Sequence, residues 1–218
     1  MNENMDPSKN SPSSSTKFLQ APIKIFQMLT ERISATMQKI MVIDRLETFV
    51  YVPAITQQPD DSNFEFRPLD SQDFAKMRHR SDRFGEQTRL YHDQRGINSA
   101  FGVFIDGDLG HISWAYTAKE YGCEPYERFR LGTGEAEIVN CYTAEAYRGK
   151  GLYPYAIRLI AEQLLSHGIK RVFMNITPDN EASRRGIIKA GLISYGKVLH
   201  WRSPIIKKWR GWYRQQLD

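Results

Sequence analysis

A short segment with two glycines, Tyr147-Arg148-Gly149-Lys150-Gly151-Leu152-Tyr153, contains residue types that can bind phosphate. Gly149 and Gly151 lack a Cβ atom, so successive main-chain N–H groups can turn to the same side there. An apolar run typical of a helix follows, and the N-terminus of a helix adds about half a positive charge. The spacing therefore predicts a cradle for a diphosphate.

Two other kinds of phosphate loop are disfavoured at this segment. A dinucleotide-binding loop needs a third glycine, and Tyr155 occupies that position. A Walker loop needs Gly-Lys followed by Ser or Thr, whereas Gly151 follows Lys150 here. A plain glycine-containing connection, in which Arg148 and Lys150 are solvated charges, stays open as the alternative.

The segments around this loop predict an α/β fold, because β-rich runs alternate with helical patterns. A hairpin is expected at Asp106-Gly107-Asp108, and one or two short helices are expected between Asp70 and Arg95. The expected strands are 64–68, 99–105, 111–116, 137–142, 171–176 and a last strand at 193–201, and the longer helices are 153–167 and 180–190.

Four regions follow from the composition along the chain. Residues 1–20 form a Ser-rich segment expected to be disordered, because it has no apolar periodicity. Residues 21–61 should hold an amphipathic helix, a short strand at Thr48–Val52 and a polar linker. The main domain is expected at 62–203, and 204–218 form a basic, aromatic C-terminal extension. The helix stripe consists of Phe26, Leu29, Ile33, Met37 and Ile40.

Overall composition indicates a folded protein. Hydrophobic residues make up 41% of the 218 residues and charged residues 25%, which suits a packed core. Two cysteines cannot form a disulfide framework, and no apolar run approaches the ~18 residues that cross a bilayer. A cytoplasmic location is the expectation. The five histidines are expected at scattered surface or capping positions, so we predict no metal site.

Positive charge concentrates near the C-terminus. Nine Lys or Arg and no acid lie between Ala182 and Leu217, so the remaining 21 basic and 25 acidic residues leave a charge of −4. Together with Trp209 and Trp212, this region suits an anionic membrane surface or a phosphate-bearing substrate. A packed extension with a solvated face stays open equally, and a nucleic-acid partner is disfavoured.

The ordered pair of motifs resembles the GNAT acetyltransferase superfamily. Arg148 to Tyr153 is similar to the family's R/Q-x-x-G-x-G/A signature except at the last position. Asn180-Glu181-Ala182-Ser183 with Ala190-Gly191-Leu192 resembles its second acetyl-CoA element, and Arg67-Pro68-Leu69 resembles its opening strand. The resemblance covers residues 62–202. It implies a central mixed, largely antiparallel sheet with splayed strands four and five, flanked by helices.

This resemblance also implies a cosubstrate, acetyl-CoA, and its binding residues. Main-chain groups of Tyr142 and Thr143 would hold the pantetheine arm and the thioester carbonyl. Asn180 and Ser183 would contact the cosubstrate from the next helix. The pyrophosphate would be held by Arg148, Gly149, Lys150, Gly151, Leu152 and Tyr153.

Glu137 resembles the general base of the family's histone-acetylating members. An alkyl amine with a pKa near ~10.4 must lose its proton before attack, which costs roughly 4.6 kcal/mol at neutral pH. A carboxylate, directly or through water, offsets part of that cost. A salt-bridged Glu on an exposed strand face is the alternative reading of Glu137.

Two positions depart from the family pattern. Ile187 replaces the Tyr that would donate a proton to the leaving thiolate, and Tyr153, Tyr155 or a water are the substitutes. Tyr153 also replaces a small residue at the end of the phosphate loop, where its side chain would crowd the cosubstrate. Cys141, on the expected strand four, is assigned no role.

Taken together, the sequence predicts an N-acetyltransferase that uses acetyl-CoA and a primary amine. A small amine, an amino sugar, a peptide N-terminus and a protein Lys all stay open as acceptors, and the basic tail favours a phosphate-bearing amino sugar. Two alternatives also stay open. One is a CoA-binding module without catalysis, and the other is a membrane or nucleic-acid adaptor that binds through the basic tail.

Overall fold

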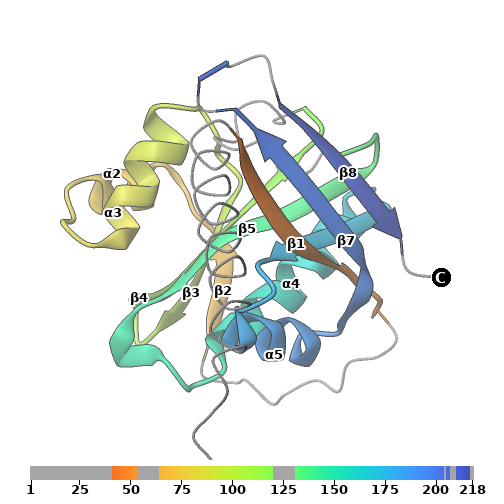
Figure 1. Ribbon diagram of the computed structural model, residues 1–218. Helices are drawn as coiled ribbons and strands as arrows, with labels where there is room; N and C mark the ends of the chain where they lie inside the picture. Colours follow the sequence, from red (N-terminus) through yellow and green to blue (C-terminus); the bar gives the residue numbers. More distant parts are fainter. Residues whose placement is uncertain (1–40, 54–63, 120–130, 204, 207–209, 217–218) are drawn as a thin grey trace, which may run out of the picture. The chain divides into compact units, whose positions relative to one another are not determined.

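The computed structural model describes residues 41–53, 64–119, 131–203, 205–206 and 210–216. Within these ranges eight strands form one sheet in the order β2-β3-β4-β5-β6-β1-β7-β8 (Figure 1). The strands are β1 (Val42–Tyr51), β2 (Glu65–Pro68), β3 (Ala100–Ile105), β4 (Asp108–Thr117), β5 (Glu135–Thr143), β6 (Arg171–Ile176), β7 (Leu192–Arg202) and β8 (Arg210–Gln216).

Helices and shorter turns connect these strands. The helices are α2 (Ser71–Arg78), α3 (Arg83–Gln87), the π-helix η2 (Thr88–Asp93), the 3-10 turn η3 (Glu145–Tyr147), α4 (Leu152–Ser166) and α5 (Glu181–Lys189). The pairs β1–β6, β2–β3, β3–β4 and β4–β5 are antiparallel, whereas β5 and β6 are parallel because α4 connects them. The result is the mixed, largely antiparallel sheet that the sequence predicts.

Helices cover both faces of the sheet. Neighbouring residues of β4 point to opposite faces, as the two-residue period of a strand requires. Ala115 belongs to the core cluster that contains Ile157 and Ile160 of α4. Trp114 belongs to the cluster that contains Phe74 of α2 and Phe84 of α3. The pair α4 and α5 therefore lies on one face, and α2 with α3 lies on the other.

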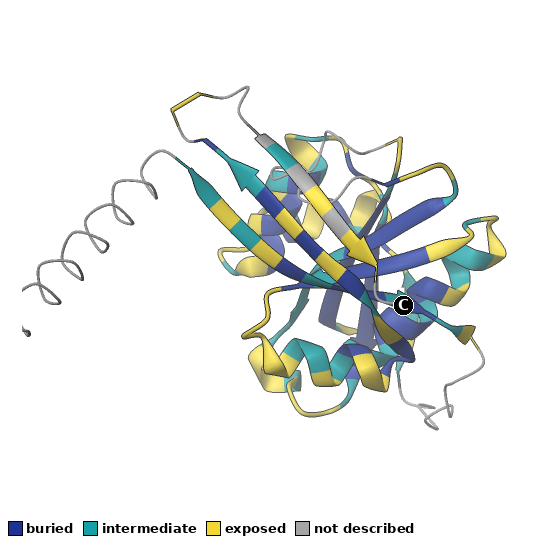
Figure 2. Cartoon of the chain, turned by 45° about the vertical axis from the view of Figure 1, so that its right-hand side comes forward, coloured by how far each residue is buried: buried dark blue, intermediate teal, exposed yellow. Residues whose placement is uncertain are grey.

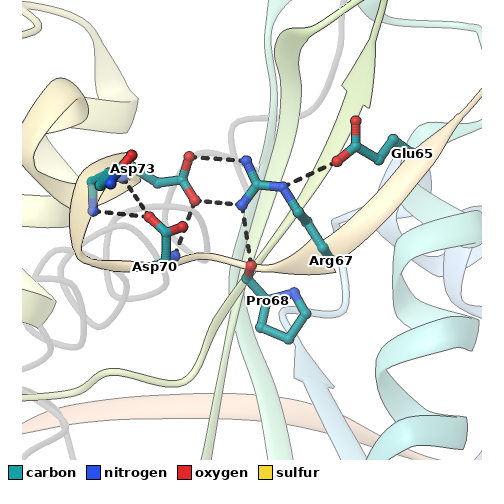
Figure 3. Close-up of polar contacts among 6 residues, drawn as sticks. Glu65, Arg67, Pro68, Asp70 and Asp73 are labelled. Atoms are coloured by element: carbon teal, nitrogen blue, oxygen red, sulfur yellow. Dashed lines mark hydrogen bonds and ion pairs between the residues drawn. The ribbon is translucent and has the colours of Figure 1, made fainter.

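An ion pair between an arginine and an aspartate attaches α2 to β2. Asp70 begins α2 as its N-cap, accepting hydrogen bonds from the main-chain N–H groups of Gln72 and Asp73 at 2.8 and 2.9 Å. The Asp73 carboxylate forms a two-pronged ion pair with the Arg67 guanidinium (Figure 3). Hydrogen bonding to Arg67 lowers the pKa of Asp73, so the pair stays ionised. This ion pair holds the first turn of α2 beside the end of β2.

Local sequence patterns are confirmed for the hairpin and for most elements. The chain reverses between β3 and β4 at Asp106-Gly107, both with positive φ. β6 has the bounds that were predicted, and α4 and α5 agree with the predicted helices to within a residue. The Ser-rich segment, the N-terminal amphipathic helix, most of the linker and residues 204, 207–209 and 217–218 of the C-terminal extension lie outside the described residues.

Two expectations about the ends of the domain differ from the structure. The strand expected at Thr48–Val52 is longer and lies inside the sheet, between β6 and β7, so the main domain does not begin at residue 62. Phe49 and Tyr51 of β1 are core residues. The strand expected to be last, at 193–201, is followed by β8, which forms the sheet edge within the predicted C-terminal extension.

Along β7, buried and exposed residues alternate from Gly196 to His200, whereas the buried residues of β1 lie between Leu46 and Tyr51 (Figure 2). The chain divides into two compact units, Ile43–His200 with Gly211–Asp218, and Met1–Val42 with Trp201–Arg210. In the second unit, Ser203 Oγ accepts hydrogen bonds from the N–H groups of Ile205 and Ile206.

None of the helices among the described residues has the length and apolar character needed to span a membrane.

Candidate active site

Strands β5 and β6 separate after a short stretch of pairing. They pair at three positions, and the last pair is Glu137 with Phe173. β5 then continues to Thr143 and β6 to Ile176 without further pairing to each other. A cavity of about 790 Å³ lies where they diverge, lined by both strands and by the N-terminal ends of α4 and α5. β5 and β6 are the strands that the sequence analysis counts as four and five of the domain, so the expected splay between them is present.

A β-bulge shapes the β5 side of the cavity. Trp114 pairs with Val139 but Ile112 pairs with Tyr142, so two residues of β5 lie opposite one residue of β4. Asn140 has φ of 51°, a left-handed conformation that Asn tolerates better than most residues. Such a bulge takes main-chain groups out of the strand ladder and bends the strand. Asn140 lines the cavity, and sequence reasoning did not single it out.

The glycine loop forms the N-terminal end of α4. Gly149 and Gly151 have φ of 80° and 87°, and a Cβ atom built at either position meets no atom within 4 Å. Backbone conformation, rather than crowding, therefore requires glycine here. Among the described residues, the N–H groups of 149–153 have no main-chain acceptor, while Tyr155 N–H donates to Gly151 O. This is a set of donors suited to an anion.

The other loop residues take different positions. The Arg148 side chain donates to Thr143 O at 3.3 Å and pairs with the Glu145 carboxylate at 3.3 Å. Lys150 does not line the cavity, and its Nζ lies 5.1 Å from the centroid of the Tyr147 ring. Leu152 packs in the core and also lines the cavity, and its N–H is the polar group that it offers to a ligand.

Tyr153 turns toward α5. Its hydroxyl lies 2.6 Å from Ser183 Oγ. A Cβ atom at Gly186 would lie 2.4 Å from the ring, so the ring packs directly on the helix backbone. Asn180 Oδ1 accepts a hydrogen bond from Ser183 N–H and caps α5. Tyr153, Asn180 and Ser183 all line the cavity.

Thr143 is held by a buried histidine. His111 Nδ1 lies 2.7 Å from Thr143 Oγ1, and His111 Nε2 lies 2.7 Å from Ser113 Oγ. Complete burial lowers the pKa of His111 to about 3, so the ring is neutral near pH 7. The expectation of a surface or capping role was wrong for His111, because the ring is inside the sheet and supports a cavity residue. Its place in the apolar run His111–Tyr116 was the available signal.

Cys141 lines the same wall of the cavity. Burial raises the pKa of its thiol to about 12, so the sulfur keeps its proton near neutral pH. Ile187, at the position where the family has a Tyr, is fully buried in the core. Neither side chain supplies an ionisable group to the site at neutral pH.

Glu137 occupies the point where the strands diverge, but it does not line the cavity. The residue is 5% exposed. Tyr116 OH donates to Glu137 Oε2 at 2.7 Å, and Asn175 Nδ2 donates to Oε1 at 2.7 Å. Thr48 Oγ1 in turn donates to Asn175 Oδ1 at 2.7 Å. The alternative of an exposed Glu is excluded, because these four residues form a buried chain of hydrogen bonds across β4, β5, β6 and β1.

The structure thus brings most of the predicted residues to one cavity. Glu137 and Lys150 do not line it. Asn175 does line it and connects it to Glu137; a polar residue in the apolar run of β6 was the signal for this position. Cavity-lining residues from the prediction are Tyr142, Thr143, Arg148, Gly149, Gly151, Leu152, Tyr153, Asn180 and Ser183.

Comparisons with known proteins agree with this geometry. A sequence model described as the acetyltransferase (GNAT) family matches residues 65–187, more than half of the chain. No curated protein matches the chain in sequence. The matched region begins at β2 and ends in α5, so it contains the glycine loop and the splayed strands.

Solved structures are similar in fold. A GNAT-family acetyltransferase from Colwellia psychrerythraea is 11% identical, with a TM-score of 0.53 over 78% of this chain and 60% of that chain. A GNAT-family protein from Novosphingobium aromaticivorans is 17% identical, with a TM-score of 0.50 over 73% of this chain and 64% of that chain. The chain therefore spans less than two thirds of each of these two proteins.

Proposed function

Because the chain belongs to the GNAT acetyltransferase family, we propose that it is an N-acetyltransferase that moves an acetyl group from acetyl-CoA to a primary amine. The observation that carries the proposal is the cavity between the diverging β5 and β6, lined by the glycine loop, whose N–H groups have no main-chain acceptor among the described residues. A volume of about 790 Å³ lies in the range of small-molecule sites. The donor set suits a diphosphate.

Acetyl-CoA would lie along β5 in this proposal. The pyrophosphate would accept hydrogen bonds from the N–H groups of the loop 149–153, with Arg148 at its side. Main-chain groups near the bulge, at Tyr142 and Thr143, would bind the pantetheine arm and stabilise the thioester oxygen as it gains charge. Asn180 and Ser183 would border the cosubstrate from α5.

The amine attacks the thioester carbon directly, and its proton must be removed first. We assign this role to Glu137, acting through a water, because the carboxylate is separated from the cavity by Asn175. A phosphate-bearing amino sugar is the acceptor favoured by the basic C-terminal segment. We propose a cytoplasmic location for the reaction.

The first test is the melting temperature with and without acetyl-CoA. At about 100 Kd of ligand, linkage adds about 2.7 kcal/mol, which corresponds to a rise of roughly 5 to 10 °C for a chain of this size. Gly151→Val should abolish the rise, because a side chain there disturbs the donor loop. Gly168→Val is the matched control. Gly168 has a similar φ, 89°, and equally open surroundings, but it lies beyond the C-terminal end of α4.

Three outcomes separate the candidate functions. A rise with wild type and Gly168→Val, together with amine-dependent release of CoA, supports the transferase. A rise without CoA release for any amine would favour a CoA-binding module without catalysis, a reading that the buried Ile187 motivates. No rise at millimolar acetyl-CoA would contradict both.

A further inference from the structure

Two hydroxyl groups, one on α4 and one on α5, meet at the wall of the cavity. Tyr153 OH and Ser183 Oγ are 2.6 Å apart, and both residues line the cavity. The pair has two hydroxyl protons, and the mutual hydrogen bond uses one of them. Within the described part of the chain, neither hydroxyl has another side-chain or main-chain partner. Either hydroxyl can be the donor of this bond; when Ser183 donates to the Tyr153 oxygen, the phenol proton is available to a ligand.

The tyrosine ring is fixed in this position. Gly186 leaves no space between the ring and the backbone of α5, since a Cβ atom there would lie 2.4 Å from Tyr153 Cδ1. The His111 ring lies on another side, with its centroid 6.0 Å from that of Tyr153. Cys141, on the β5 wall, lines the same cavity as Tyr153. The ring thus lies between α5 and His111, whose Nδ1 contacts Thr143 Oγ1, and Thr143 is where we place the thioester.

The other tyrosine that the sequence left open points elsewhere. Tyr155 OH donates to Phe64 O at 3.4 Å, its ring packs edge-on against Phe64, and it does not line the cavity. Ile187 carries no donor at all and is buried. Of these three side chains, Tyr153 is the one that has a hydroxyl donor and lines the cavity.

Resting on the proposed transferase function, we propose that the Tyr153 hydroxyl donates a hydrogen bond to the sulfur that leaves acetyl-CoA. The amine nitrogen forms a bond to the carbonyl carbon, the carbon–sulfur bond breaks, and its electron pair passes to sulfur. Tyr153 stabilises the resulting thiolate. The thiolate then takes a proton from solvent and departs as the CoA thiol, while the amine proton leaves through water to Glu137.

Hydrogen bonding, rather than transfer of the tyrosine proton, fits the environment of this phenol. Burial raises the pKa of Tyr153 above its ordinary value, so the phenol remains protonated through the alkaline range. A thiol with a pKa near ~8.5 is a stronger acid than such a phenol, so the proton stays on Tyr153. Tyr153 should accordingly not ionise between pH 8 and about 10. The pH profiles of wild type and Tyr153→Phe should therefore have the same shape in this range.

The test compares Tyr153→Phe with Tyr155→Phe, measured as amine-dependent release of CoA and as calorimetric affinity for CoA. Tyr153→Phe keeps the ring that packs on Gly186 and removes only the hydroxyl. We expect kcat to fall about 10- to 100-fold, the loss typical of one hydrogen bond to a developing anion. The Kd for CoA should stay within about 3-fold, because this hydrogen bond forms mainly in the transition state. Tyr155→Phe should leave both quantities near wild type.

Several results would contradict the inference. An active wild type with an equally active Tyr153→Phe variant would overturn it and leave the proposed function intact. A weaker CoA affinity with an unchanged kcat would place the hydroxyl on the bound cosubstrate instead of the leaving sulfur. A wild type without turnover would overturn the proposed function and, with it, this role. Equal melting temperatures of the two variants would confirm that both are folded.

Discussion

The environment of Glu137 determines which proton transfers it can support. Both oxygens of its carboxylate accept hydrogen bonds, from Tyr116 and from Asn175. The Asn175 amide is oriented by Thr48, so the chain of donors is aligned toward the carboxylate. Such a network stabilises a buried charge that would otherwise be costly. Asn175 lies between the carboxylate and the cavity, so in the proposed mechanism the amine proton reaches Glu137 through a water.

Replacing this carboxylate tests its role directly. Glu137→Gln should lower kcat/KM at pH 7 by about 10²-fold, the usual contribution of a general base. The loss should shrink as pH rises toward the pKa of the amine, near ~10.4, because the amine then loses its proton without help. The measurement is the pH profile of CoA release, with CoA affinity measured in parallel.

A purely structural Glu137 would give a different profile. Wild type and variant would then keep parallel pH profiles, while the melting temperature of the variant would fall. That combination would remove Glu137 from the mechanism and leave the cavity as the site.

At the scale of elements, the closeness of α4 and α5 depends on a small residue. Gly186 lets the Tyr153 ring lie against the backbone of α5, and Asn180 caps the same helix next to Ser183. The first turns of both helices therefore form one side of the cavity. Their separation sets the position of the hydroxyl pair.

Gly186→Ala measures this contact. Ala in a helix is ordinarily more favourable than Gly by about 0.5–1 kcal/mol. Here the added Cβ would clash with Tyr153, and we expect a loss of about 1–3 kcal/mol, as for other overpacked sites. The free energy of urea unfolding gives the value.

The same substitution in a Tyr153→Ala background is the control. Without the ring, Gly186→Ala should become stabilising by its ordinary helix preference. A destabilisation of equal size in both backgrounds would show that Tyr153 is not the source of the clash.

At the scale of the whole sheet, β1 joins two parts of the molecule. It pairs with β6 over Glu47 to Val50, and its other neighbour is β7. Phe49, paired with Met174, is 4% exposed, while Ile43 of the same strand is 51% exposed. A segment that the sequence separates from the domain therefore contributes to the core behind the cavity.

Two substitutions in β1 check this contribution. Phe49→Ala should cost about 3–5 kcal/mol of unfolding free energy, because it leaves a cavity in the core. Ile43→Ala should change stability by about 0.5 kcal/mol or less, as is usual at exposed positions. Similar small effects at both positions in urea unfolding would show that β1 is not integral to the domain.

Some features of this protein depend on neighbouring residues and could be predicted from the sequence. The hairpin at Asp106-Gly107, the helix α4 and the strand β6 each follow from turn residues or from a periodic pattern. The glycine loop before α4 and the Asn cap of α5 are similarly local, since each is a conformation of consecutive residues. These elements sufficed to predict an α/β fold and the loop that lines the cavity, whereas the splayed strands followed from the family resemblance.

Other features depend on contacts between residues far apart in the chain. Thr48 and Asn175 meet only because β1 enters the sheet beside β6, and no local pattern of β1 specifies that neighbour. Lys150 lies against Tyr147, Glu137 lies away from the cavity, and His111 is buried beneath Thr143. The sequence by itself determined which backbone segments could form the site. Tertiary packing decided which side chains reach it, because burial and pairing are properties of the assembled sheet.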